Sequence, residues 1–174
     1  MNIAITGTSS GLGRSLEDFF KKDAKIYSMN EPLNSYIGNL KVHLKECDIF
    51  INNKWEYELQ TNIFKEASKL WMYENKTIVN ILTSAVYYGS MNIRYADDKK
   101  VLHDYTINNR LDDKKLRVIN IYPNALQRSK QTAYATLKYN DVAEIISFAI
   151  NLPQSIELFS IGINRTTTIN KGLI

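Results

Sequence analysis

Apolar runs of strand length recur along the chain, and stretches with helical spacing lie between them. The runs cover Asn2–Thr6, Lys25–Met29, Asp48–Asn52, Thr77–Leu82, Leu116–Tyr122 and, with a weaker pattern, Ile156–Gly162. Short apolar runs that alternate with helical segments are typical of a parallel sheet whose strands are joined by crossover helices. The pattern therefore predicts the α/β class, with a doubly wound parallel sheet of about six strands.

Apolar stripes at spacings of three and four residues mark the helices that join these runs. The first stripe is Leu12, Leu16, Phe19 and Phe20, and the second is Leu59, Ile63, Ala67 and Leu70. A third helix is expected over Ala96–Leu111, and a fourth is expected to begin with Asp141 as its N-cap and to end before Pro153. No repeat, low-complexity tract or linker divides residues 1–174, so we expect a single domain.

The composition fits one soluble domain. The 174 residues are 44% hydrophobic and 23% charged, which allows a sizeable apolar core. No apolar run approaches the roughly 20 residues of a membrane-spanning helix, and the first residues lack the basic and then apolar layout of a signal peptide. We therefore expect a cytoplasmic protein without a membrane partner. The single Cys47 falls in an apolar run, so it forms no intrachain disulfide and is expected in the core.

The net charge of +4 raises the question of a nucleic-acid partner, because clustered Lys and Arg bind phosphates. The basic clusters are only pairs, Lys21–Lys22, Lys99–Lys100 and Lys114–Lys115, and an Asp lies beside each pair. This pattern favours a solvated surface over a nucleic-acid interface. The two histidines, His43 and His103, have no partners at metal-ligand spacing, so no metal site is expected and each histidine is read as an ordinary surface or helix residue.

Three of the seven glycines, Gly7, Gly11 and Gly13, lie between the first strand and the first helix. Glycine allows a sharp turn there, lets a pyrophosphate approach the backbone, and lets the helix pack closely on the strand. The amides and the positive dipole end of the helix then favour the phosphates. The context predicts a nucleotide site over an ordinary tight turn. The residues expected at the cofactor are Thr6, Gly7, Ser9, Ser10, Gly11, Leu12 and Gly13.

The spacing TGxxxGxG at Thr6–Gly13 resembles the cofactor motif of the short-chain dehydrogenase/reductase family, whose members have a Rossmann fold. The family's other motifs follow in the same order: Asn52-Asn53 for the first half of an Asn-Asn-Ala-Gly motif, Ser84 for the catalytic serine, Tyr95 and Lys99 for a YxxxK motif, and Pro123 for a Pro-Gly motif. Two departures stand beside these matches, namely Lys54-Trp55 in place of Ala-Gly and Asn124 in place of glycine.

The resemblance implies an NAD(P)-dependent oxidoreductase that transfers hydride between a nicotinamide cofactor and a small carbonyl or alcohol substrate. Tyr95 would exchange the proton, and Ser84 would orient the substrate oxygen. A free tyrosine has a pKa of about 10, so Lys99 would favour the phenolate and would also bind the nicotinamide ribose. Asn62, on the second predicted helix, would take part in a proton relay.

The cofactor half of the chain is shorter than in the family. The 18 residues 30–47 stand where family members fit a helix, a strand and a second helix, so one βα unit is expected to be missing. At the end of the second strand, Asn30 takes the position that discriminates between cofactors. Asn30 and Glu31 favour NAD(H), while Arg14 and Lys21 leave NADP(H) open. The resemblance also implies cofactor contacts for Asn52, Asn53, Tyr95, Lys99 and Pro123.

Two alternatives stay open. A second YxxxK copy, Tyr134 to Lys138, follows the Pro123 strand, where family members have their substrate loop. The chain could also be a catalytically idle dinucleotide-binding or interaction protein that kept only the Rossmann core. By analogy with family members, the helices over Leu59–Leu70 and Ala96–Leu111 would pair in a homodimer or a homotetramer.

Overall fold

The computed structural model describes residues 1–30, 33–88, 93–108, 115–124, 126, 137–156 and 158–164. Six parallel strands form one sheet with the order β2-β1-β3-β4-β5-β6. The strands are β1 (Asn2–Thr6), β2 (Lys25–Met29), β3 (Ile49–Asn52), β4 (Thr77–Ile81), β5 (Arg117–Pro123) and β6 (Ser160–Ile163). Each strand lies on a predicted apolar run, which confirms the α/β class and the parallel sheet. The last run forms a strand only in its C-terminal part.

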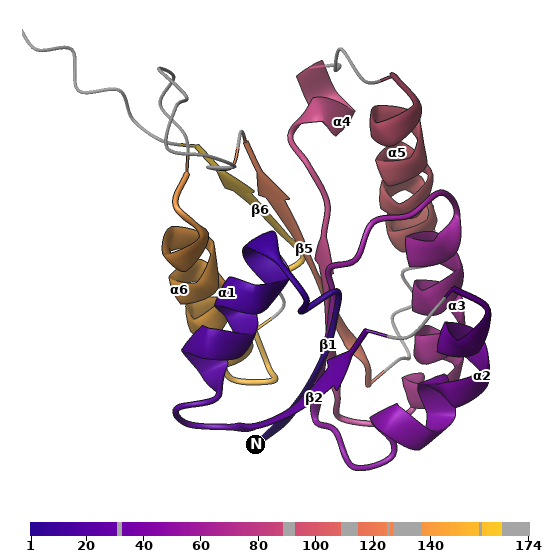
Figure 1. Cartoon of the computed structure of the whole chain (residues 1–174), viewed down its shortest axis with the longest axis vertical. Coiled ribbons are helices and arrows are strands. Elements are labelled where there is room, and N and C mark those ends of the chain that lie inside the picture. The colour runs from indigo at the N-terminus through magenta and orange to yellow at the C-terminus, as the bar shows by residue number, and fades with distance from the viewer. Residues whose placement is uncertain are drawn as a thin grey trace, which may run out of the picture.

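Helices cover both faces of the sheet (Figure 1). They are α1 (Gly11–Phe20), α2 (Leu33–Leu44), α3 (Leu59–Trp71), α4 (Ala85–Tyr88), α5 (Ile93–Asn108) and α6 (Tyr139–Ile150). Helices α1 and α6 lie on one face, and α2, α3 and α5 lie on the other. No helix in the described ranges is long and apolar enough to cross a membrane.

Alternate residues of β1 to β5 enter two separate cores, because both faces of this parallel sheet are covered. Ile3 and Ile5 of β1 belong to the core beneath α1 and α6, whereas Ala4 belongs to the core beneath α2 and α3. Cys47 lies fully buried in the second core, as predicted, and this burial raises the pKa of its thiol to about 11.

The connection between β2 and β3 is short. Between Met29 and Ile49, the described residues form one helix, α2, and no strand. Strand β2 is therefore the edge of the sheet. The predicted loss of one βα unit agrees with this six-stranded order, although α2 itself was not among the predicted helices.

Helix α6 begins earlier than predicted. Lys138 is its N-cap, and Asp141 is the third helical residue, so the prediction of Asp141 as N-cap is wrong. Asp141 Oδ2 accepts a hydrogen bond of 3.1 Å from the Lys138 amide. A carboxylate in the first turn satisfies a free amide and interacts favourably with the helix dipole, so it marks a helix start without being the cap.

A row of asparagines crosses the middle of the sheet. Asn52, Asn80 and Asn120 lie in register on β3, β4 and β5 and are fully buried. Asn52 Nδ2 donates to Asn80 Oδ1 at 3.0 Å, and Asn80 Nδ2 donates to Asn120 Oδ1 at 3.1 Å. Asn120 Nδ2 then donates to Thr106 Oγ1 on α5 at 2.8 Å. The row joins three strands to α5 through polar groups that would be costly to bury without partners.

Replacing Asn80 by Val should destabilise the protein by roughly 2–5 kcal/mol, because Asn52 and Asn120 each lose a buried hydrogen-bond partner. Urea unfolding followed by circular dichroism measures this loss. Asn39→Ala is the control, since Asn39 is exposed on α2 and alanine favours a helix, so the free energy of unfolding should not fall. A loss below about 1 kcal/mol for Asn80→Val would show that the row contributes little.

Candidate active site

The turn between β1 and α1 requires glycine at three positions. Gly7 and Gly11 have φ angles of +71° and +57°, in the left-handed region that favours glycine. A Cβ atom on Gly13 would lie 2.0 Å from the Gly7 carbonyl oxygen, so α1 packs directly on the turn. Ser10 is the N-cap of α1, and its side chain makes no capping hydrogen bond. A helix start without a side-chain cap favours a bound anion.

Thr6 and Asn53 tie the turn to the loop that follows β3. Thr6 is fully buried, and its Oγ1 accepts hydrogen bonds of 2.9 Å from the amides of Asn53 and Lys54. Asn53 Nδ2 donates to the Thr6 carbonyl oxygen at 3.1 Å. A Cβ atom on Gly7 would lie 2.9 Å from Lys54 Cβ, so the loop closes against the turn. Thr6 and Asn53 thus hold the turn against the loop that follows β3, and Leu12 packs in the core beneath α1 and α6.

Asn30 braces the turn from the end of β2. Its Oδ1 accepts a hydrogen bond of 3.1 Å from the Ser9 amide, and its Nδ2 donates to Thr8 Oγ1 at 2.7 Å. The Gly7 amide donates to the Met29 carbonyl oxygen at 3.0 Å. The side chain predicted to discriminate between cofactors therefore also holds the turn in shape. Glu31, its neighbour in that prediction, lies outside the described residues.

Ser84 lies where β4 and β5 end. Its Oγ hydrogen-bonds Asn124 Oδ1 at 3.2 Å, and its amide donates to the Pro123 carbonyl oxygen at 3.2 Å. The carboxyl ends of parallel strands share one edge of a sheet, so Ser84 and Pro123 lie on the same edge as the glycine turn after β1. Asn124, which replaces a family glycine, is the residue that holds the Ser84 side chain.

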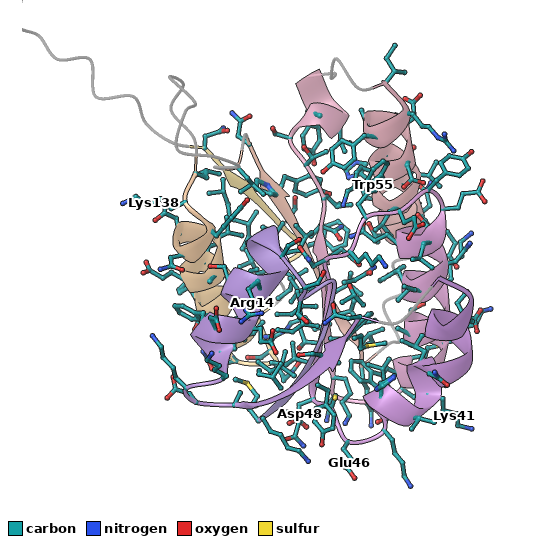
Figure 2. The ribbon with its side chains drawn as sticks, in the orientation of Figure 1. Arg14, Lys41, Glu46, Asp48, Trp55 and Lys138 are labelled. Atoms are coloured by element: carbon teal, nitrogen blue, oxygen red, sulfur yellow. The ribbon has the colours of Figure 1, made fainter. Side chains whose placement is uncertain are left out.

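Tyr95 and Lys99 lie one turn apart on α5, beside the ends of β3 and β4. The half-buried Tyr95 ring meets the Trp55 ring edge to face, with centroids 5.0 Å apart. Lys99 Nζ lies 5.5 Å from the centre of the Tyr95 ring. Trp55 Nε1 donates to Asp98 Oδ2 at 2.8 Å, which holds the indole against α5 (Figure 2). The structure brings Tyr95 and Lys99 together and adds Trp55, which stands where the family motif has glycine.

Lys99 points into the protein. Its side chain is 2% exposed, and its Nζ donates hydrogen bonds of 2.6 Å to Gln60 Oε1 and to the Ile81 carbonyl oxygen. Burial lowers the pKa of Lys99 to about 7, while the neighbouring Asp98 carboxylate opposes that shift. The lysine therefore carries its positive charge at acidic pH and loses it as the pH rises through neutrality.

Asn62 lies on the outer side of α3, away from this lysine. It is exposed and lines a cavity of about 880 Å³ between α3 and α5, together with Tyr57 and Arg94. The α3 residue that contacts Lys99 is Gln60, which is not among the site residues predicted from the sequence. Gln60 falls on the buried stripe of α3 four residues before Phe64, and a polar residue on an apolar stripe is the signal that would have found it.

His103 joins an aromatic cluster beside this edge of the sheet. Its Nδ1 lies 2.6 Å from the Tyr122 hydroxyl, and the Tyr87 ring packs against both side chains with centroids 5.5 and 5.1 Å away. Burial lowers the pKa of His103 and raises the pKa of Tyr122. The imidazole and the phenol are therefore both neutral at neutral pH, and they share one hydrogen bond. The cluster fixes α4, which follows Ser84, against α5 and β5.

No protein-family model and no curated protein sequence matches this chain. Solved structures do match its fold. A short-chain dehydrogenase/reductase from Vibrio parahaemolyticus superposes with a TM-score of 0.76 at 14% identity, over 95% of this chain and 100% of that chain. This chain has the short-chain dehydrogenase/reductase fold.

Two further similar structures are complexes with nicotinamide dinucleotides. The 3-ketoacyl-(acyl-carrier-protein) reductase from Brucella melitensis, complexed with NADH, has a TM-score of 0.71 at 17% identity, over 93% of this chain and 96% of that chain. The alcohol dehydrogenase from the archaeon Thermococcus sibiricus, complexed with 5-hydroxy-NADP, has a TM-score of 0.69 at 11% identity, over 96% of this chain and 99% of that chain. At these identities the likeness concerns the fold, and it is the fold that the sequence motifs predicted.

Gly13→Ala should destabilise the protein by about 1–3 kcal/mol, because the new Cβ would overlap the Gly7 carbonyl oxygen and push α1 off the turn. Urea unfolding measures the change. Gly38→Ala is the matched control on α2, where no atom lies within 4 Å of the added Cβ, and it should stabilise the helix by up to about 1 kcal/mol. Wild-type stability in Gly13→Ala would contradict the close packing of α1 on the turn.

Proposed function

We propose that this chain is an NAD(P)-dependent oxidoreductase that interconverts a carbonyl compound and an alcohol, with Ser84, Tyr95 and Lys99 as its catalytic residues. One observation carries the proposal: α5 sets Tyr95 beside Lys99 at the sheet edge where the glycine turn follows β1. In doubly wound folds, ligands bind at this edge, where the strand order reverses. Here the order reverses between β1 and β3.

The residues of the turn fit a nicotinamide dinucleotide. Gly7 and Gly13 allow a tight turn, because a Cβ on either would meet Lys54 or the Gly7 carbonyl oxygen. The start of α1 offers amides to a pyrophosphate. The likeness to proteins solved with NADH and with 5-hydroxy-NADP supports this class of cofactor. Asn30 brings an uncharged amide to the discriminating position and no cation for a 2′-phosphate, which favours NAD(H) over NADP(H).

The proposed roles follow from the chemistry of the side chains. When bound, the cofactor supplies or accepts the hydride. In the reducing direction, the carbonyl carbon gains the hydride while the Tyr95 hydroxyl gives its proton to the carbonyl oxygen, which leaves an alcohol and a phenolate. Lys99 stabilises the phenolate when it carries its positive charge. Ser84 orients and polarises the substrate oxygen, and Asn124 holds the Ser84 side chain.

A second candidate function is binding of a dinucleotide without catalysis. Trp55 packs on Tyr95 where the family motif has glycine, and Asn30 already accepts a hydrogen bond from the Ser9 amide. Both contacts would narrow the space for substrate and cofactor. The two candidate functions agree in cofactor binding and differ in turnover, so turnover separates them.

We also propose that two copies pair through α3 and α5, in a homodimer or a homotetramer. The outer sides of these helices expose apolar side chains, among them Leu70, Ile93 and Val101, which are 37%, 70% and 55% exposed. Contact with a second copy would remove such side chains from water.

Tyr95→Phe should lower turnover by about 10²- to 10⁴-fold, because the ring packing is kept while the acidic proton is removed. The assay follows NADH oxidation with a carbonyl substrate found by screening, after titration of NADH fluorescence has shown saturable binding. Tyr105→Phe is the control on the same helix, since that ring packs on Phe64 instead, and it should leave turnover unchanged. Full activity in Tyr95→Phe would remove the proposed active site.

The second YxxxK copy gives a further check. Tyr134 lies outside the described residues, and the proposal assigns it no part in proton transfer. If Tyr134→Phe alone abolished turnover, the proton donor would be misassigned even though the fold is right.

A further inference from the structure

We propose that Gln60 is the positioning residue for Lys99, and that it holds the lysine ammonium at the carboxyl ends of β3 and β4 through a direct hydrogen bond. The catalytic role of Lys99 rests on the proposed function. The arrangement of Gln60 itself is independent of any reaction.

The orientation of the Gln60 amide is fixed by its surroundings. The side chain is 1% exposed, and its Nε2 donates to the carbonyl oxygens of Asn52 and Ile81 at 2.6 and 3.0 Å. These two bonds use both amide hydrogens. A flipped amide would set Oε1 against two carbonyl oxygens, so Oε1 must face Lys99, which it meets at 2.6 Å.

Neutral oxygens are the direct partners of the lysine. Gln60 on α3 and the Ile81 carbonyl on β4 both accept from its Nζ, and neither carries a charge. On its own helix, Lys99 has the Tyr95 ring and the Asp98 carboxylate as neighbours. That carboxylate accepts hydrogen bonds from Trp55 Nε1 and from the backbone amide of Glu58. A neutral acceptor can hold the lysine in both its protonation states, because both states keep N–H donors.

Gln60 is anchored to the sheet through the asparagine row. Asn52 Nδ2 donates to the Gln60 carbonyl oxygen and to Asn80 Oδ1, both at 3.0 Å. From Asn80 the row continues through Asn120 to Thr106 on α5. Lys99 lies on the same helix and donates to Gln60, so these hydrogen bonds link α5, the sheet and α3 in a closed loop. The position of Lys99 therefore follows from the register of three strands.

The test is a titration of Lys99 by NMR, with ¹³C-labelled lysine in the protein without cofactor or substrate. Its resonance is assigned by its loss in Lys99→Met. In the wild type the midpoint should fall near pH 7, because burial beside neutral oxygens disfavours the charge. Gln60→Met keeps the length of the side chain and removes the acceptor, so it should lower the midpoint by about one pH unit.

Asn62→Met is the matched control, because Asn62 lies on the same helix with an exposed side chain. It should leave the Lys99 midpoint at the wild-type value. An unchanged midpoint in Gln60→Met, or an equal shift in Asn62→Met, would overturn the proposal. If Gln60→Met does not fold, the wild type alone decides, since a midpoint near the ordinary 10.5 would mean that Lys99 is not held in its buried position.

A second readout links Gln60 to the proposed function. If Lys99 binds the ribose, Gln60→Met should weaken NADH binding by about 10-fold, the effect of losing one well-placed hydrogen bond. Wild-type affinity in a folded Gln60→Met would overturn the positioning role. A wild-type protein that binds no NADH would contradict the proposed function. The NMR titration requires no cofactor, so the midpoint of the Lys99 titration would still test the role of Gln60.

Discussion

The carboxyl ends of the parallel strands leave backbone groups that the sheet no longer pairs, and the rest of the structure depends on the side chains that satisfy them. At the end of β1, the Thr6 hydroxyl accepts hydrogen bonds from the amides of Asn53 and Lys54. At the ends of β3 and β4, the side chains of Gln60 and Lys99 donate hydrogen bonds to the carbonyl oxygens of Asn52 and Ile81. Unpaired polar groups in these buried places would each cost about 1–3 kcal/mol, so these side chains are fixed by the fold before any ligand arrives.

This constraint places the two halves of the candidate site on one edge. The glycine turn belongs to β1 and is braced by Asn30 from β2, while Tyr95 and Lys99 reach the ends of β3 and β4 from α5. The short connection before β3 leaves this edge intact, because α2 joins β2, at the border of the sheet, directly to β3.

The apolar runs predicted the strands well, since a strand that is covered on both faces must be apolar along its length. The strand-turn-helix context likewise predicted the glycine turn. A polar residue on the buried stripe of α3 marks Gln60, but local patterns could not identify its partner Lys99 or the asparagine row, because these partners come from segments far apart in the sequence. The N-cap of α6 was misplaced for a related reason, since an acidic side chain favours several positions in the first helical turn.

Two of the residues that differ from the motifs of the short-chain dehydrogenase/reductase family, Trp55 and Asn124, have defined contacts in this fold. Trp55 is hydrogen-bonded to Asp98 and packs on Tyr95, and Asn124 holds Ser84. Such contacts either shape a working substrate pocket or close it. A crystal structure with NADH bound decides between these outcomes most directly. Our account predicts the pyrophosphate on the amides of the Gly7–Gly13 turn and nicotinamide C4 facing the Tyr95 hydroxyl and Ser84. A nicotinamide ring turned away from Tyr95, or a cofactor bound elsewhere, would contradict it.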